Sequence, residues 1–310
     1  MRWNPFSQHL KRLFPWKVAK IPLDAGFTCP NVDGSLAFGG CTYCDNKSFS
    51  PNARVERSTI AEQIRRGIER YRPKGFEHFI AYFQASSNTY APVPRLKELY
   101  DEALSFPEVV GLSIGTRPDC VPDPVLDLVQ SYTSRVRVWL EMGAQTMSDE
   151  ANRRTNRVHT WGDFADALRR SSGRGFELVA HTILGLPGDT PDGMRETAVE
   201  LGRLGIDSVK VHHLYVCPGT VIEDQYGRGE VRVMELDEYV GLACDFLERL
   251  PERVSIQRLV GELDGPYVLA PLWGCTKSEV LSRLEAEFVR RGTRQGSMAC
   301  ADPCMSRPDR

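Results

Sequence analysis

The sequence predicts an α/β protein in which parallel strands form an incompletely closed barrel. Short apolar runs alternate with amphipathic helical patterns, which is typical of repeated βα units and a parallel sheet. Several predicted strands are apolar on one face and polar on the other. The hydrophobic fraction of 41% and the charged fraction of 26%, over 310 residues, are those of a globular protein.

Apolar runs predict the six strands of the barrel. These are Lys17–Leu23, His78–Gln84, Val109–Gly115, Arg135–Met142, Phe176–Leu184 and Ser208–Val216. Amphipathic segments between them predict five covering helices. These are Ser58–Tyr71, Pro94–Ser105, Asp123–Ser131, Thr160–Ser171 and Pro191–Leu204. Thr190 before Pro191 is a typical helix start, and Ser58 is the predicted cap of the first helix, with Glu62 in its first turn.

A further α/β segment follows the barrel. It contains a predicted helix at Glu235–Leu250, a strand at Val254–Val260 and a helix at Lys277–Arg291. The sequence therefore divides into four predicted parts: an N-terminal arm (1–16), the barrel (17–220), a C-terminal extension packed on the barrel (221–295) and a loose tail (296–310).

The faces of the predicted strands indicate where a ligand binds. In Arg135–Met142, the side chains of Trp139 and Glu141 share one face, and the opposite face is apolar. Lys210 and His212 likewise share one face of the sixth strand. A strand in a fully packed barrel would be apolar on both faces. The polar inner faces therefore predict an open barrel that holds a ligand at the C-terminal ends of its strands.

Composition narrows the class of protein. The formal net charge of −2 gives no global signature of nucleic-acid binding. The N-terminus lacks the apolar core of a signal peptide, and no apolar run approaches the roughly 18 residues of a membrane span. The nine cysteines are an odd number without the spacing of a disulfide scaffold. A reducing cytoplasm is the expected location, where clustered cysteines indicate metal or redox chemistry.

Three of these cysteines occupy one loop rich in glycine, proline and asparagine. Cys41 and Cys44 are separated by two residues, and Cys29 precedes them in the stretch GFTCPNVDGSLAFGGCTYCDN. A structural zinc site normally needs four ligands in two pairs, and a dithiol redox motif would leave Cys29 unused. Incidental thiols are a poor explanation for three cysteines in a polar loop. A [4Fe–4S] cluster with three thiolates would leave one iron open to a small molecule.

The loop resembles the cluster motif of the radical S-adenosylmethionine (SAM) superfamily. Its long first gap is similar to that of the elongator-type and YhcC/YtqA-like branches. The resemblance to the YhcC/YtqA-like branch continues through nearly the whole chain, in the stretches AKIPLDAGFTCPN, YFQASSNTYAP, GLSIGTRPDC, WLEMGAQT, TILGLPGDT and VKVHHLYVCPGT.

This resemblance implies a partial (β/α)6 TIM-type barrel, which agrees with the six predicted strands. It also implies that Cys29, Cys41 and Cys44 bind three irons of a [4Fe–4S] cluster, and that SAM chelates the fourth. The reduced cluster would cleave SAM to methionine and a 5′-deoxyadenosyl radical, which abstracts hydrogen from a substrate. A reductant such as flavodoxin or ferredoxin would supply the electron.

The same resemblance suggests contacts to SAM. Tyr43 precedes the last cysteine, and Gln84 or Asn88 stands where the family usually has Gly-Gly-Glu, so either could hold the SAM amine. Glu141, at the end of the fourth strand, is a candidate for the ribose hydroxyls. The loop that begins at Gly185 would run beside the adenine of SAM.

Catalytic residues are not identified by the sequence, but three side chains are candidates. Arg117 could bind the SAM carboxylate or a substrate anion, or it could form an ion pair with Asp119. Lys210 or His212 could donate a proton or contact substrate, whereas a satisfied interior histidine is the plainer interpretation.

Several other residues have two interpretations. Arg153, Arg154, Arg157 and His159 follow the fourth strand and could receive an anionic substrate or form a solvated surface. Cys300 and Cys304 could contribute to a second cluster or belong to the tail.

The sequence therefore predicts a radical SAM enzyme but does not identify its substrate. The resemblance to elongator-type and YtqA-like proteins suggests a tRNA wobble uridine. A small metabolite or cofactor precursor is the alternative substrate. A protein of another class, a zinc-stabilised binding module without catalysis, also remains open. No membrane partner is expected.

Overall fold

Seven parallel strands form one curled sheet in the computed structural model, which describes residues 1–54, 58–261 and 265–299. The strands lie side by side in chain order, and every neighbouring pair is parallel. All of their C-terminal ends therefore meet at one mouth of a half-barrel. The strands are β1 (Val18–Leu23), β2 (His78–Phe83), β3 (Val109–Thr116), β4 (Arg137–Gln145), β5 (Glu177–Leu184), β6 (Ser208–His213) and β7 (Ser255–Arg258).

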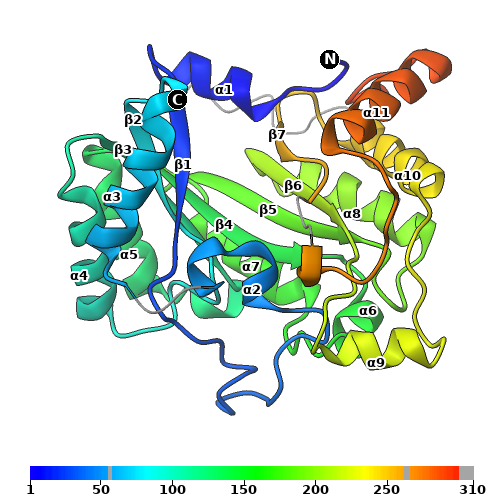
Figure 1. Ribbon diagram of the computed structural model, residues 1–310, viewed down its shortest axis with the longest axis horizontal. Coiled ribbons are helices and arrows are strands. Elements are labelled where there is room, and N and C mark those ends of the chain that lie inside the picture. The colour runs from blue at the N-terminus through cyan, green and yellow to red at the C-terminus, as the bar shows by residue number, and fades with distance from the viewer. Residues whose placement is uncertain (55–57, 262–264, 300–310) are drawn as a thin grey trace.

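Helices cover the outside of the half-barrel, as Figure 1 shows. The helices that follow successive strands are α3 (Ile60–Tyr71), α4 (Val93–Leu104), α5 (Asp123–Ser131), α7 (Trp161–Ser171) and α8 (Pro191–Arg203). Of two later helices, α10 (Leu236–Arg249) packs against α8, and α11 (Lys277–Arg291) packs against α10. The shorter helices are α1 (Phe6–Leu13), α2 (Asn46–Phe49), α6 (Asp149–Arg154) and α9 (Val221–Gly227). Among the residues described, no helix is long and apolar enough to cross a bilayer.

The predicted strands and long helices are confirmed, with small shifts at their ends. The cap of α3 was predicted one residue too early. Thr59 Oγ1 accepts a hydrogen bond from the Glu62 amide, and the Glu62 carboxylate accepts one from the Thr59 amide. This capping box satisfies the first free amides of the helix, which Ser58 does not do. The four short helices were not predicted, because a single turn or two carries little periodicity.

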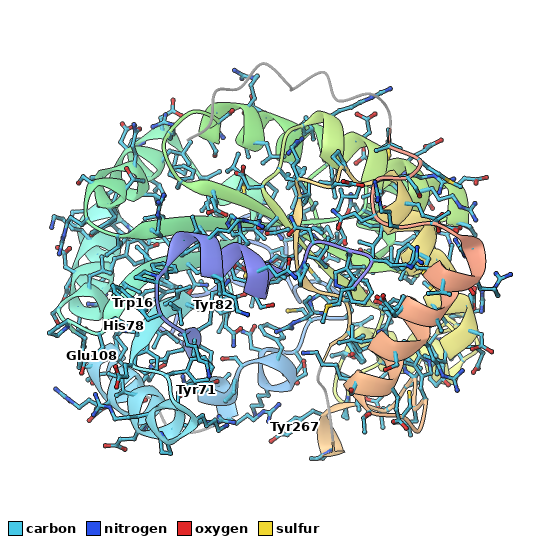
Figure 2. The ribbon with its side chains drawn as sticks, turned by 90° about the horizontal axis from the view of Figure 1, so that it is seen from above. Trp16, Tyr71, His78, Tyr82, Glu108 and Tyr267 are labelled. Atoms are coloured by element: carbon cyan, nitrogen blue, oxygen red, sulfur yellow. The ribbon has the colours of Figure 1, made fainter. Side chains whose placement is uncertain are left out.

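Helix α1 closes the N-terminal end of the half-barrel. Phe6 packs edge-on against Trp139 of β4, with 6.1 Å between ring centroids, in a small cluster with Ile80 and Val179. Seen from above, α1 lies across the middle of the molecule (Figure 2). Just after α1, Trp16 stacks on His78 at the start of β2. The half-barrel therefore has an apolar floor at its N-terminal end.

The C-terminal segment completes the sheet and ties the two ends of the chain together. The predicted strand at Val254–Val260 pairs with β6 and becomes β7 of the same sheet. Gln295 is buried, and its backbone N–H donates to the Arg2 carbonyl at 2.9 Å. Gly296 and Met298, expected to begin a loose tail, donate backbone hydrogen bonds to α10. The remainder of that tail, with Cys300 and Cys304, lies outside the described residues.

A close approach of α3 to β1 generates a testable prediction. A Cβ added at Gly67 would come within 2.5 Å of the buried Ile21 side chain. We expect Gly67→Ala to lower the free energy of unfolding by about 1–3 kcal/mol, because overpacking outweighs the better helix propensity of alanine. Urea denaturation of the purified variant measures this change.

Gly241 provides the matched control, because it also lies inside a helix but has room for a side chain. Its nearest neighbour would be 3.8 Å from an added Cβ. Gly241→Ala should raise the free energy of unfolding by up to about 1 kcal/mol. Equal effects of the two substitutions would contradict the packing argument.

Candidate functional site

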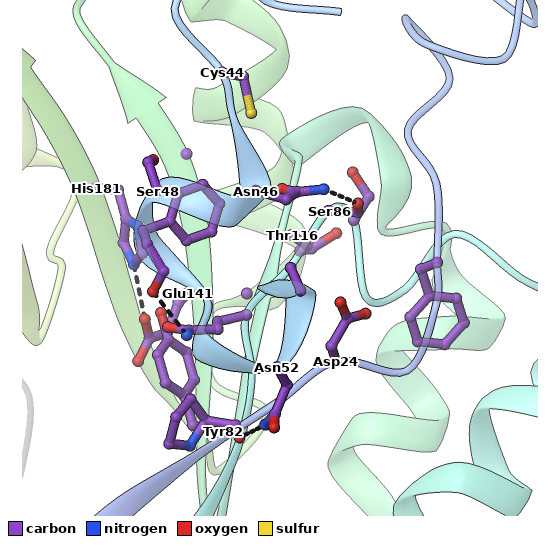
Figure 3. A pocket seen from close by; sticks show the side chains of 18 of the residues that line it. Asp24, Cys44, Asn46, Ser48, Asn52, Tyr82, Ser86, Thr116, Glu141 and His181 are labelled. Atoms are coloured by element: carbon purple, nitrogen blue, oxygen red, sulfur yellow. Dashed lines mark hydrogen bonds and ion pairs between the residues drawn. The ribbon is translucent and has the colours of Figure 1, made fainter. Parts of the chain in front are cut away.

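A pocket of about 1750 Å³ opens at the mouth of the half-barrel and reaches into its interior. Residues from the ends of all the central strands and from the cysteine loop line it (Figure 3). Figure 3 also shows the close contact of His181 with Glu141 deep in this pocket and that of Asn46 with Ser86 nearer its mouth. The polar inner faces that the sequence predicted therefore line a real cavity.

The cysteine loop follows β1 and is held by side-chain amides. Asn156 Nδ2 donates to the carbonyls of Phe38, at 3.0 Å, and Gly40, at 2.8 Å. Asn31 Nδ2 donates in return to the Asn156 carbonyl at 3.0 Å. Asn156 adopts a left-handed conformation with φ of 53°, which asparagine tolerates better than most residues. This clamp fixes the loop against the segment that follows α6.

All three loop cysteines line the pocket. Cys41 is buried, and its Sγ lies 3.4 Å from Asn31 Nδ2 and 3.6 Å from Arg157 Nη1. Cys29 Sγ lies 3.2 Å from Ser87 Oγ. In the described part of the chain, no three histidine, cysteine, aspartate or glutamate side chains are placed to hold a single metal ion.

The electrostatic surroundings distinguish the three thiols. Burial would raise the pKa of Cys41, but the guanidinium groups of Arg157 and Arg117 outweigh it, and the pKa is lowered. Burial raises the pKa of Cys29. Cys44 is the exposed member of the three, and partial shielding from water by the surrounding protein, with the negative charges of Cys41 and Cys29, raises its pKa. The charges of the three sulfurs therefore act on one another, and only Cys41 has cationic neighbours that outweigh the effect of burial.

The basic run after β4 separates into two pairs in the structure. Arg153 and Arg154 are exposed and pair with Glu150 on α6. Arg157 and His159 are buried beneath the cysteine loop instead. Burial and the neighbouring arginines lower the pKa of His159 to about 2, so it stays neutral. The sequence did not distinguish the two pairs, because they lie within one short stretch.

Arg117 forms the ion pair with Asp119 that the sequence offered as the plainer interpretation. Its Nε and Nη2 donate to the carboxylate at 2.9 and 2.7 Å, and Nη2 also donates to the Arg157 carbonyl. The remaining nitrogen, Nη1, is buried and has no hydrogen-bond partner among the described residues. A buried guanidinium nitrogen without a partner carries a desolvation cost that a bound anion would remove. Arg117 also lines the pocket.

Of the five predicted SAM contacts, three line the pocket and two do not. Tyr43, Gln84 and Glu141 line the pocket. Asn88 is buried, does not line the pocket, and donates through Nδ2 to the Gly115 carbonyl at 2.8 Å. Gly185 is likewise outside the pocket lining, with Met234 close to where its side chain would be.

Glu141 is the centre of a polar network inside the barrel. Its Oε1 accepts hydrogen bonds from Lys20 Nζ, at 2.6 Å, and from Ser113 Oγ, at 2.6 Å. Its Oε2 accepts from Lys210 Nζ and lies 2.7 Å from His181 Nε2. Burial would raise the pKa of Glu141, but the two lysines lower it well below its usual value. The carboxylate is therefore charged and fully used by the chain's own donors.

Two site residues were missed by the sequence reasoning. Gln145, the last residue of β4, lines the pocket in a left-handed conformation with φ of 61°. Such strain in a residue other than glycine is often found at functional sites. Asn31 contacts Cys41, as described above. Gln145 could have been found, because it is a polar residue at the C-terminal end of a predicted strand, whereas the role of Asn31 depends on a contact across the loop.

Comparisons with known proteins agree with this architecture. The profile of the radical SAM superfamily matches residues 38–201, and that of the radical SAM C-terminal domain matches residues 206–290. YtqA of Bacillus subtilis is 36% identical over 95% of this chain and 92% of its own. A tRNA uridine(34) acetyltransferase of Dehalococcoides mccartyi is 27% identical to this chain. The matched region covers 58% of this chain and 39% of that protein.

A solved structure supports the same fold. The archaeal Elp3 of Methanocaldococcus infernus superposes with a TM-score of 0.69 at 17% identity, covering 90% of this chain and 64% of that one. Seven parallel strands, the two matching profiles and the similarity to YtqA are consistent with one another. The chain therefore belongs to the radical SAM superfamily, in its YhcC/YtqA-like branch, and is an enzyme of that class.

Proposed function

We propose that Cys29, Cys41 and Cys44 hold a [4Fe–4S] cluster at the mouth of the half-barrel. The observation that carries the proposal is the buried pairing of Cys41 with Arg157 and Asn31, which favours a thiolate at a position where burial alone would oppose it. Superfamily membership supports the same assignment. When bound, the cluster and SAM supply a 5′-deoxyadenosyl radical that abstracts hydrogen from the substrate.

The loop is suited to a bulky inorganic group. Gly39 and Gly40 have φ of 82° and 72°, and a side chain at Gly39 would meet no atom within 4 Å. The backbone can therefore approach a ligand closely and donate amide hydrogen bonds to it. Tyr43 Oη and Thr42 Oγ1 are buried without partners in the described structure. These unpaired groups fit a loop whose remaining partner is a bound cofactor.

We further propose how this chain's residues hold SAM. The free Nη1 of Arg117 would bind the SAM carboxylate, since a guanidinium matches a carboxylate in charge and shape. Gln84 and Gln145 offer amide groups at the pocket wall for the amine and the ribose. The sequence-based role of Glu141 in binding ribose stays a prediction, but its oxygens already accept from four groups of the chain.

A tRNA nucleoside is the substrate class that we favour. Its support is the similarity to an enzyme named for uridine 34 of tRNA, together with basic side chains at the pocket rim. Lys47, Arg54 and Arg70 line the pocket and are exposed, so they could contact phosphates around the target nucleoside. A flavodoxin or ferredoxin would supply the electron. A small metabolite or cofactor precursor is the alternative substrate.

The cluster assignment predicts a loss of iron in one variant. Anaerobically reconstituted protein should be brown and hold about four iron and four sulfide per chain, as this cluster type requires. Cys41→Ala should lose the cluster and the formation of 5′-deoxyadenosine, because only two thiolates remain. Iron analysis and absorbance spectra measure this loss.

Cys275→Ala is the matched control, because Cys275 is a partly buried free cysteine outside the pocket. It should retain wild-type iron. Full cluster content in Cys41→Ala, or a colourless wild-type protein that holds zinc, would overturn the assignment and favour a zinc-stabilised module.

The proposed SAM contact predicts a change in affinity. Arg117→Gln should weaken SAM binding to the reconstituted protein by roughly tenfold or more, because one charge-assisted hydrogen bond is lost. Equilibrium dialysis with labelled SAM measures it. Arg153→Gln removes an exposed arginine that does not line the pocket and should leave affinity unchanged. Unchanged SAM affinity in an Arg117→Gln protein with an intact cluster would remove Arg117 from the site.

The proposed tRNA substrate predicts a salt dependence. Three basic rim residues should give a slope of about 2–3 in a plot of log Kd for tRNA against log salt concentration, because each phosphate contact releases counterions. Lys47→Gln should reduce this slope by nearly one. Lys97→Gln, on α4, should not change it, because Lys97 does not line the pocket and pairs with Asp101. Absent or salt-insensitive tRNA binding would favour the small-molecule substrate.

A further inference from the structure

A layer of positive charge lies inside the half-barrel, beneath the proposed cluster site. Lys20 of β1, Lys210 of β6 and Arg258 of β7 all line the pocket at this depth, and we call them the cationic layer. Glu141 is the carboxylate that faces them among the described residues. The floor below is the apolar cluster around Phe6 and Trp139.

The charges of this layer do not balance. Glu141 compensates one positive charge, whereas Lys20 and Arg258 each bring a formal positive charge. Lys210 also binds Glu141, but burial lowers the pKa of its amine well below the usual value, so the surplus is counted from Lys20 and Arg258 alone. The nearby histidines do not add negative charge. Burial lowers the pKa of His181 to about 4 and lowers that of His212 further below its usual value, so both are neutral at pH 7. A surplus of positive charge in an enclosed space is costly unless an anion accompanies it.

Arg258 is the group of this layer that the described part of the chain leaves without a partner. It has no hydrogen bond or ion pair with any residue in the described ranges, although its charge acts on Tyr82, His181 and Lys210. Its neighbour Gln257 accepts from Lys20 Nζ at 2.8 Å, while the Gln257 Nε2 donor is buried without a partner. A guanidinium and an amide donor are thus both available on the same strand.

Glu141 explains why the lysines stay in place without a ligand. It holds Lys20 and Lys210 on opposite oxygens, while Lys210 also donates to Tyr82 Oη at 2.7 Å. Both side chains are therefore pre-positioned, so binding an anion would cost little ordering of the site. Arg258 and the Gln257 amide would complete the ring of donors.

We propose that the cationic layer binds an oxyanion, a carboxylate or a phosphate, carried by the substrate. This inference rests on the proposed function, because it places the substrate in the barrel below the cluster and SAM. It narrows the substrate to molecules with an anionic group that can reach the middle of the barrel. Glu141 acts as the positioning residue of this subsite, and Arg258 contacts the anion.

The test measures binding of two small probes, acetate and inorganic phosphate. Reconstituted protein is saturated with SAM, which occupies the pocket mouth, and is titrated at constant ionic strength by calorimetry. We expect one probe to bind and Arg258→Gln to weaken it roughly tenfold or more, as expected for a lost charged hydrogen bond. A preference for acetate indicates a substrate carboxylate, and a preference for phosphate indicates a nucleotide phosphate.

The matched control is Arg228→Gln, an exposed arginine that pairs with Glu230. It should bind both probes as the wild type does. Because Arg258 has no partner among the described residues, its replacement should leave the melting temperature unchanged, and a large decrease would indicate a structural role instead. Absence of probe binding, or equal binding by both variants, would overturn the proposal.

The same titration separates this inference from the proposed function. If the protein acquires no cluster, the assignment of the cysteines fails, while probe binding to the purified chain still reports on the cationic layer. If the cluster forms and SAM is cleaved but neither probe binds, the proposed function stands and the oxyanion subsite does not.

Discussion

The interior of this protein depends on one buried carboxylate. Glu141 accepts hydrogen bonds from β1 and β3 on one oxygen and from β5 and β6 on the other. Polar side chains inside a barrel are costly unless they are paired, and this residue pairs four of them at once. The barrel can therefore stay wide enough for a ligand without filling its centre with apolar side chains.

The cysteine loop depends on a different kind of restraint. Few regular elements hold it, so its position comes from amide side chains that bind backbone carbonyls, chiefly Asn156 and Asn31. The same segment carries Arg157 to Cys41. One short stretch after α6 thus restrains the loop and lowers the pKa of its most buried thiol. Because these contacts come from side chains, they are sensitive to single substitutions.

The sequence predicted the architecture well, since strand and helix periodicity persist over long segments. It placed β4 correctly, and it placed Glu141 on the polar inner face of that strand. It also identified the superfamily through several motifs. It could not separate Arg157 from Arg153, because burial of one and exposure of the other depend on how the chain turns after α6. It could not find the unused donors of Arg258, since a missing partner is visible only in three dimensions. The roles of the individual cysteines and SAM contacts stay predictions.

The apolar plug formed by α1 has a consequence for large substrates. With Phe6 and Trp139 sealing one end, the protein is a cup rather than a tunnel. A polymer would therefore reach the interior from the mouth, through a unit that protrudes from its surface. For a folded RNA, that unit would be a nucleotide swung out of its stack, and the energy of unstacking would favour positions in loops over those in paired stems.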